Sequence, residues 1–314
     1  MSRYRVVGVV ANPQRPEVPA TVREAVDWLR GRSLDVRCAP DLGRSLPIDL
    51  PAFAWADLAR QVDLVLTFGG DGTILYAARH LAGQAIPIFG VNTGTLGFLT
   101  SSSRVSMLES FERLFDGEGA VEPHMTLRAE VERAAEARGS GAPARRAAAL
   151  GKDGVESGDG TFTALNDVVV HKGAVTARVL DLRLELDGEE VGTYVADGLI
   201  LSTPLGSTGY ALSAQGPLVV PTMQAIVATP ICPHTLATRP LVLPAEADVR
   251  VTVIERQERA GLAVDGNLVA ELDIGDAIRV TRSEHEVHLV RLPDRGFFRL
   301  LRSKLHWGGR TSET

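Results

Sequence analysis

The chain has 314 residues, of which 45% are hydrophobic and 23% charged, and its formal net charge at pH 7 is −6. This composition is ordinary for one large or two average globular domains, and the acidic balance argues against general nucleic-acid binding. The longest apolar runs have only the length of strands, so no membrane span is expected, and no secretion signal is expected before Asn12-Pro13. The two cysteines, Cys38 and Cys232, are expected to remain thiols in a reducing cytoplasm.

The first 123 residues alternate between strand and helix patterns. Apolar runs predict buried strands, and apolar residues at helical spacing predict amphipathic helices. The strands are expected at 5–11, 35–39, 62–68 and 86–91, and the helices at 22–29, 53–60, 73–81 and 105–115. Strands that alternate with helices indicate a mostly parallel sheet covered on both faces, so we predict a Rossmann-like α/β domain over residues 1–123.

The pattern changes after Pro123, and strand signals predominate from 124 to 292. The clearest is 180–186, where leucines alternate with charged residues up to the hairpin turn Asp187-Gly188. Residues 134–160 show no period and are expected to form a long mobile loop. We predict an antiparallel β-sandwich domain over 124–292, and a C-terminal helix within 293–314 that returns to the first domain. Further strands are expected at 125–131, 249–254, 262–264, 277–281 and 286–291.

Five residues after the third strand carry the strongest functional signal. Gly69-Gly70-Asp71-Gly72-Thr73 lies between the predicted strand at 62–68 and the predicted helix at 73–81, at the edge where open α/β sheets bind ligands. Glycines let a phosphate approach the backbone, and the N–H groups of a helix N-terminus favour anions. Asp71 would repel a phosphate. It is therefore either an N-cap of the helix or a group that holds a metal ion or accepts a proton from an attacking hydroxyl.

Three further stretches have the composition of ligand-binding segments. A second glycine-rich loop at 90–98 follows the next strand and should face the same crevice. Asn166-Asp167 stands out in an apolar strand pattern, either as an Asx turn or as a pair that recognises sugar hydroxyls. Residues 197–213 join a buried strand to a loop rich in hydroxyl groups, in which Tyr210 can stack on a flat ring.

In this order and spacing, these motifs resemble the NAD kinases, and the resemblance covers nearly the whole chain except 134–160. It implies transfer of the terminal phosphoryl group of ATP to the 2′-hydroxyl of the NAD adenosine ribose, with Asp71 as catalytic base. It also implies Mg²⁺ or another divalent cation on the donor phosphates, no metal site of the protein's own, and a homodimer or homotetramer. The implied nucleotide-binding residues are Gly69, Gly70, Gly72, Thr73, Asn92, Phe98, Asn166, Asp167, Asp197, Thr208, Gly209, Tyr210, Ala211, Leu212, Ser213 and Asn267.

The chain departs from the family pattern around the expected NAD pocket. Asp167 stands where many members have Glu, Gly209 where most have Ala, Asn267 where many have Gln, and Val195 where some bacterial members have Arg. Two alternatives stay open. One is another kinase with a Gly-Gly-Asp-Gly loop that acts on a lipid or a sugar phosphate, and the other is a non-catalytic NAD(P)-binding regulator. The sequence does not decide between ATP and polyphosphate as donor, or between NAD and NADH as acceptor.

Overall fold

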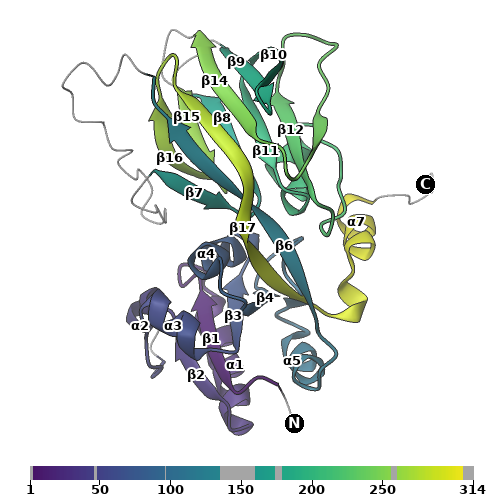
Figure 1. Cartoon of the computed structure of the whole chain (residues 1–314). Coiled ribbons are helices and arrows are strands. Elements are labelled where there is room, and N and C mark those ends of the chain that lie inside the picture. The colour runs from purple at the N-terminus through teal and green to yellow at the C-terminus, as the bar shows by residue number, and fades with distance from the viewer. Residues whose placement is uncertain are drawn as a thin grey trace, which may run out of the picture. The chain divides into compact units, whose positions relative to one another are not determined.

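The structure is a computed structural model that describes residues 3–45, 48–95, 97–134, 160–173, 179–255 and 260–306 (Figure 1). Nearly all of the predicted loop at 134–160 lies outside the described residues. The chain forms two compact units, one made of Met1–Pro123 and Glu286–Thr314 and the other of His124–His285.

A parallel sheet forms the centre of the first unit. Its strands lie in the order β2-β1-β3-β4, and the end of β17 (Ala277–Arg291) extends it by pairing in parallel with β4. The predicted parallel α/β fold is therefore confirmed. The strands are β1 (Val6–Ala11), β2 (Asp35–Cys38), β3 (Leu64–Gly69), β4 (Pro87–Asn92) and the short β5 (Ser102–Ser103).

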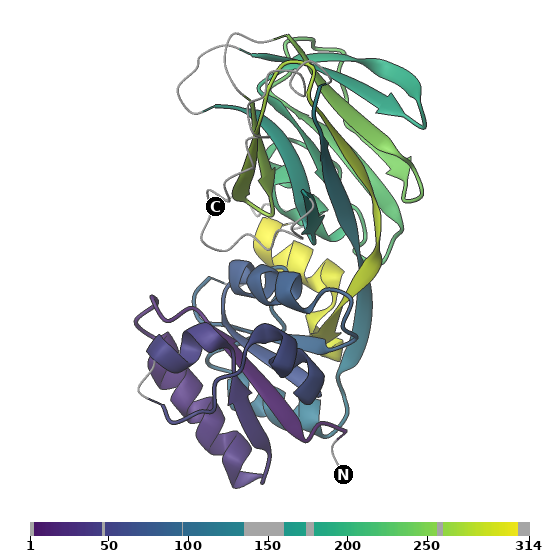
Figure 2. The same ribbon diagram turned by 60° about the vertical axis from the view of Figure 1, so that its left-hand side comes forward.

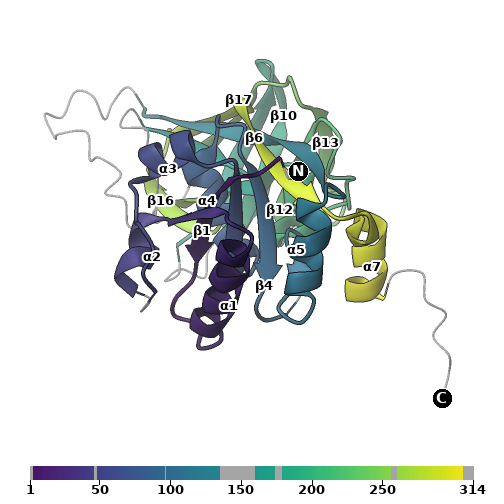
Figure 3. The same cartoon turned by 90° about the horizontal axis from the view of Figure 1, so that it is seen from below.

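Helices cover both faces of this parallel sheet (Figure 3). Alternate strand residues, such as Val7, Leu66 and Phe89, are buried with apolar side chains of α1 and α5 in one core. On the opposite face α4 packs closely against β4. A Cβ added at Gly90 of β4 would lie only 3.2 Å from Cγ1 of Ile74 in α4. The helices of this unit are α1 (Val18–Gly31), α2 (Pro40–Ser45), α3 (Trp55–Gln61), α4 (Asp71–Leu81), α5 (Met107–Phe115), the 3₁₀ turn η3 (Pro293–Arg295) and α7 (Phe297–Leu305).

The second unit consists of two sheets with a shared apolar core (Figure 2). One sheet has six strands in the order β13-β12-β11-β8-β15-β16, and the other contains β10-β9-β14-β17 with β6 and β7. The predicted antiparallel β domain is confirmed. Its other strands are β6 (Ala120–Glu132), β7 (Thr161–Ala164), β8 (Asp167–Lys172), β9 (Leu180–Leu186), β10 (Glu189–Ala196), β11 (Gly198–Ser202), β12 (Ala225–Ile231), β13 (Leu241–Pro244), β14 (Val249–Glu255), β15 (Ala260–Val264) and β16 (Asn267–Leu272).

One expectation about the strands was wrong. The strands predicted at 277–281 and 286–291 are a single strand, β17, because the polar residues between them continue the extended backbone. Thr126 of β6 donates a hydrogen bond to the carbonyl of His285 at 2.6 Å, which holds this polar stretch in the sheet. The sequence assigned 286–292 to the β-rich domain, whereas Glu286 and the residues after it lie in the first unit.

The hydroxyl-rich segment after β11 is also more ordered than expected. It folds as a 3₁₀ turn, η2 (Leu205–Thr208), and a short helix, α6 (Tyr210–Ser213). The Ser207 hydroxyl donates to the Pro204 carbonyl at 2.6 Å, within the segment. The Thr203 hydroxyl donates to the Leu165 carbonyl at 2.7 Å and so links the segment to the residue before Asn166-Asp167.

Candidate functional site

The Gly-Gly-Asp-Gly loop lies where β3 passes directly into α4. Gly69 is the last residue of β3, Gly70 is the N-cap and Asp71 is the first residue of α4. A Cβ at Gly69 would lie 3.0 Å from Thr73 Cβ and closer still to its Oγ1, so the tight junction requires glycine. A Cβ at Gly72 would meet nothing within 4 Å, so packing does not explain why this position is glycine.

The Asp71 carboxylate is held by the second glycine-rich loop. Its Oδ2 accepts the backbone N–H of Phe98 at 2.8 Å, and its Oδ1 accepts that of Leu99 at 3.1 Å. No side chain caps α4, so the interpretation of Asp71 as an N-cap was wrong. A Cβ at Gly97 would lie 2.7 Å from Asp71 Oδ2 and closer still to Oδ1, so the approach of the carboxylate depends on this glycine.

Asn92 organises the loop that holds Asp71. Its buried side chain accepts the Gly94 N–H at 2.7 Å and donates to the Thr95 carbonyl at 2.8 Å. The predicted ligand contact of Asn92 therefore competes with bonds that shape its own loop. Phe98 is buried, and the ammonium of Lys304 in α7 lies 4.3 Å from the centre of its ring.

A buried arginine that the sequence did not single out belongs to the surroundings of Asp71. Arg291 ends β17, and its Nε lies 3.7 Å from Glu122 Oε2. Burial lowers the pKa of the Arg291 guanidinium, and the negative charges of Glu122 and Asp71 oppose that shift. No pattern in the sequence distinguishes this arginine, because it lies at the end of an ordinary strand.

In the second unit, the Asn166-Asp167 pair is fixed by Asp265. The two oxygens of the Asp265 carboxylate accept backbone N–H groups of three consecutive residues: Leu165 at 3.1 Å, Asn166 at 2.7 Å and Asp167 at 3.2 Å. Asp265 has a positive φ of 45° in the turn between β15 and β16. The sequence motifs pointed to Asn267 of this turn as a site residue and not to Asp265. The sequence feature that could have indicated Asp265 is its place in a tight Asp-Gly turn.

The side chains of the pair are largely removed from solvent. Asp167 is only 4% exposed, and burial, followed by the charge of Asp265, raises the pKa of its carboxyl to about 7. The Oδ1 of Asn166 is buried and has no hydrogen-bond partner in the structure. A Cβ at Gly209 would lie 3.5 Å from Asn166 Nδ2 and 3.8 Å from Asp167 Oδ2. The structure therefore brings these three predicted residues together.

The other predicted residues of the second unit have different surroundings. Tyr210 is 48% exposed and Ser213 is exposed, whereas Ala211 is buried in an apolar cluster. Leu212 and Thr208 are half-buried, and the Thr208 hydroxyl donates to the Leu205 carbonyl at 3.0 Å. The side chains of two further predicted residues, Asp197 and Asn267, already have partners within the protein. Asp197 pairs with Lys172 at 2.7 Å, and the Asn267 amide donates to the carbonyl of Asp265 at 3.1 Å.

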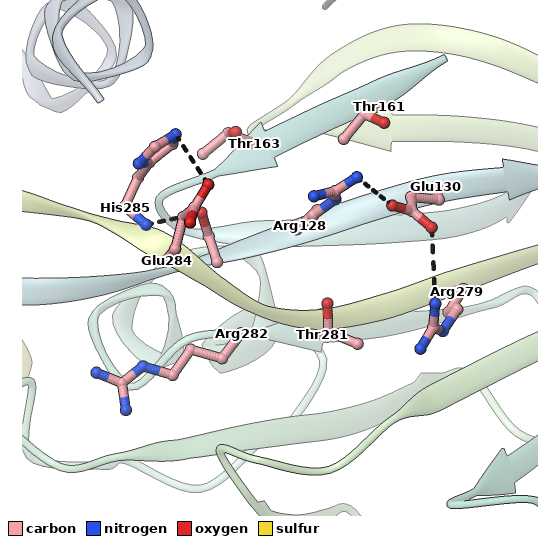
Figure 4. A pocket seen from close by; sticks show the side chains of 10 residues that line it. Arg128, Glu130, Thr161, Thr163, Arg279, Thr281, Arg282, Glu284 and His285 are labelled. Carbon is pink, nitrogen blue, oxygen red and sulfur yellow. Dashed lines mark hydrogen bonds and ion pairs between the residues drawn. The ribbon is translucent and has the colours of Figure 1, made fainter. Parts of the chain in front are cut away.

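A separate pocket of about 530 Å³ lies in the second unit, lined by charged and hydroxyl side chains (Figure 4). Glu130 of β6 pairs there with Arg128 at 2.5 Å and lies 3.9 Å from Arg279 of β17. None of the predicted site residues lines this pocket.

The described ranges lack two kinds of feature. No group of three or more His, Cys, Asp or Glu side chains there could hold a metal ion. None of the helices in those ranges is both long and apolar enough to span a membrane.

A parallel α/β unit with a Gly-Gly-Asp-Gly strand–helix junction, in one chain with an antiparallel β unit, fits a phosphotransferase. Two family models match the chain. The one described as the ATP-NAD kinase N-terminal domain covers residues 7–119, and the one described as the ATP-NAD kinase C-terminal domain covers residues 165–292. The chain belongs to the NAD kinase family, as the motifs indicated.

Relatives and solved structures agree with this assignment. The NAD kinase of Geobacter metallireducens is 40% identical over 308 residues, which are 97% of this chain and 99% of that protein. The NAD kinase of Gemmatimonas aurantiaca is 40% identical over 309 residues, 96% of each. The crystal structure of yeast NADH kinase complexed with NADH has a TM-score of 0.82 at 26% identity, over 99% of this chain and 90% of that one. An NAD kinase from Archaeoglobus fulgidus in complex with ATP has a TM-score of 0.67 at 26% identity, over 96% and 98%.

Proposed function

We propose that this chain transfers the terminal phosphoryl group of ATP to the 2′-hydroxyl of the NAD adenosine ribose, which gives NADP. The observation that carries the proposal is the Asp71 carboxylate, fixed at the junction of β3 and α4 by two backbone N–H groups. The relatives are named for NAD, and the two solved structures contain NADH and ATP. These names support the choice of substrates.

Asp71 is the general base of the proposed reaction. An ionised carboxylate has about four lone-pair sites, and the N–H groups of Phe98 and Leu99 take one on each oxygen. The remaining sites can accept the proton of the ribose hydroxyl. Phosphoryl transfer depends mainly on positioning and charge neutralisation, so the fixed orientation of Asp71 matters more than its basicity.

Each unit carries its own set of proposed ligand contacts. Residues 69–73 hold the donor phosphates, and Gly72, which packing does not require to be glycine, leaves the backbone open to them. Asn166 and Asp167 hold the ribose hydroxyls, for which the buried, unbonded Oδ1 of Asn166 is a suitable acceptor. Asp197, residues 208–213 and Asn267 line the proposed NAD pocket.

The proposed metal ion is Mg²⁺, carried by the phosphates of ATP. Mg²⁺ seldom uses a cage made only of protein ligands, and the described residues contain no such cage. When bound, the ion neutralises charge on the donor phosphates. We further propose a cytoplasmic enzyme that assembles into a homodimer or homotetramer through its β units.

The test is NADP formation from NAD, ATP and Mg²⁺ by the pure protein, beside its Asp71→Asn variant. The wild type should form NADP, and Asp71→Asn should lose about 100- to 10,000-fold in kcat while its affinity for NAD is retained. A wild type that binds NAD and forms no NADP would identify a regulator. Phosphorylation of a lipid or a sugar phosphate in place of NAD would identify another Gly-Gly-Asp-Gly kinase. An unchanged kcat in Asp71→Asn would remove Asp71 as the base.

A further inference from the structure

The segment between β1 and α1 lies at a position in the parallel sheet where ligands are expected. In the order β2-β1-β3-β4, the chain leaves β1 for a strand on one side and leaves β3 for a strand on the other. Ligands of open α/β sheets bind outside the carboxyl ends of the strands at such a switch point. The segment after β1 therefore belongs to the same crevice edge as the Gly-Gly-Asp-Gly loop.

Backbone hydrogen bonds fix this segment beside β3. The Asn12 N–H donates to the Phe68 carbonyl at 3.1 Å, which ties the end of β1 to the end of β3. A turn then follows, in which the Arg15 N–H donates to the Asn12 carbonyl at 3.3 Å and the Val18 N–H donates to the Arg15 carbonyl at 3.1 Å. These bonds therefore fix the backbone of Arg15 beside the end of β3.

The Arg15 guanidinium reaches both glycine-rich loops. A Cβ at Gly94 would lie 2.6 Å from Arg15 Nη1, and a Cβ at Gly70 would lie 3.6 Å from Nη2. Gly94 comes from the loop after β4, and Gly70 is the N-cap of α4. One planar cation therefore lies beside both of the loops that follow neighbouring strands.

This cation has no anionic partner in the described part of the chain. Arg15 is half-buried, and its side chain makes no ion pair or hydrogen bond with any described residue. Most arginines in such settings pair with a carboxylate or a carbonyl. The nearby Thr93 hydroxyl, which is buried, also has no hydrogen-bond partner. Two groups able to donate hydrogen bonds are thus left unpaired in one loop cluster next to a helix N-terminus, and such groups suit an anion.

We propose that Arg15 binds the phosphate chain of the phosphoryl donor. The guanidinium matches two phosphate oxygens with a pair of parallel N–H bonds. Its charge would offset the repulsion between the donor phosphates and Asp71. A side chain at position 94 would displace the Arg15 guanidinium. This inference rests on the proposed function, because it concerns the donor of that reaction.

The first experiment compares Arg15→Gln and Arg15→Lys with a matched control, Arg60→Gln. Arg60 lies in the same unit and pairs with Asp57 on the surface. Loss of charged hydrogen bonds to the donor should raise the KM for ATP about 10- to 100-fold in Arg15→Gln, with a smaller rise in Arg15→Lys. The KM for NAD should not change, and Arg60→Gln should match the wild type. A wild-type KM for ATP in Arg15→Gln would overturn the proposal.

A binding measurement separates this proposal from the proposed function. Calorimetry with inorganic tripolyphosphate needs no NAD and no turnover, so it is informative even if the wild type forms no NADP. The wild type should bind tripolyphosphate about 10- to 100-fold more tightly than Arg15→Gln. Equal affinities would overturn the proposal whatever the kinase assay shows.

A third variant tests the contact between Arg15 and Gly94. Gly94→Ala keeps the arginine but displaces its guanidinium, so it should raise the KM for ATP in the same direction. The double variant with Arg15→Gln should be no worse than Arg15→Gln alone, because both changes act through one side chain. Effects that add in full would refute the contact.

Discussion

Replacing Gly97 by alanine tests whether the position of Asp71 sets the rate of phosphoryl transfer. The new Cβ would lie 2.7 Å from Asp71 Oδ2 and closer to Oδ1, well inside ordinary van der Waals contact. The carboxylate would have to move by about 1 Å or more to relieve this overlap. Its hydrogen bonds to Phe98 and Leu99 would lengthen at the same time, because they belong to the loop that carries the new methyl group.

The expected loss in rate is large. A misplacement of about 1 Å can cost about 100-fold, and loss of a general base costs about 100- to 10,000-fold. The kcat of Gly97→Ala for NADP formation should therefore fall by about 100-fold or more. The affinity for NAD, measured by calorimetry, should stay near that of the wild type, since Asn166 and Asp167 belong to the other unit.

Gly31→Ala is the matched control, because a Cβ at the end of α1 would meet nothing within 4 Å. Its kcat should equal that of the wild type. The double variant of Gly97→Ala with Asp71→Asn should be no slower than the slower single variant, because both act through one carboxylate. A folded Gly97→Ala enzyme with the wild-type kcat would refute the reasoning.

Two further predictions concern the second unit. Because the pKa of Asp167 is raised to about 7 in the folded protein, its ionisation removes stability as pH rises toward about 7, and Asp167→Asn avoids that loss. The free energy of unfolding, measured in urea for the wild type and for Asp167→Asn, should fall with rising pH only in the wild type. The difference between the two proteins should therefore change by up to about 3 kcal/mol in favour of the variant between about pH 5 and about pH 8. The same dependence on pH in both proteins would contradict this prediction. Asp265→Asn leaves three backbone N–H groups facing one carbonyl and one NH₂ group, so the Asn166-Asp167 turn should lose its orientation. Calorimetry should show NAD affinity reduced about 10-fold or more with the KM for ATP unchanged; unaltered NAD affinity would argue against this role of Asp265.

The layout of elements could largely be predicted from the sequence, because it depends on local periodicity. The strand and helix patterns of the first unit correspond to β1 to β4 and to most of its helices, and the Asp187-Gly188 hairpin joins β9 and β10 as expected. β17 was missed as one strand because its polar middle is held by the neighbouring β6, which no local pattern reveals. Short elements such as α2 and α6 lack enough periodic residues to be recognised.

The motifs of the site could be located from the sequence, but the function of each residue within a motif could not. Asn92 and Ala211 lie in segments that composition predicts to bind ligands, yet the first shapes its own loop and the second is buried in a core. Asp265 and Arg15 act on segments distant in sequence, and only the fold brings these together. Side-chain bonds to a distant backbone depend on register and on loop conformation, which spacing does not encode.

Bonds from a carboxylate to a distant backbone do not by themselves mark a catalyst. Asp63 accepts the N–H groups of Arg5 and Val6 at 2.8 and 2.9 Å, much as Asp71 accepts those of Phe98 and Leu99. Asp63, however, precedes β3 and bonds to the start of β1, at the edge of the parallel sheet opposite to ligand sites. Asp71 follows β3, at the glycine-rich edge where open α/β sheets bind ligands. A carboxylate that accepts two backbone N–H groups therefore stabilises the sheet at one end of β3 and, in our proposal, takes part in the reaction at the other end.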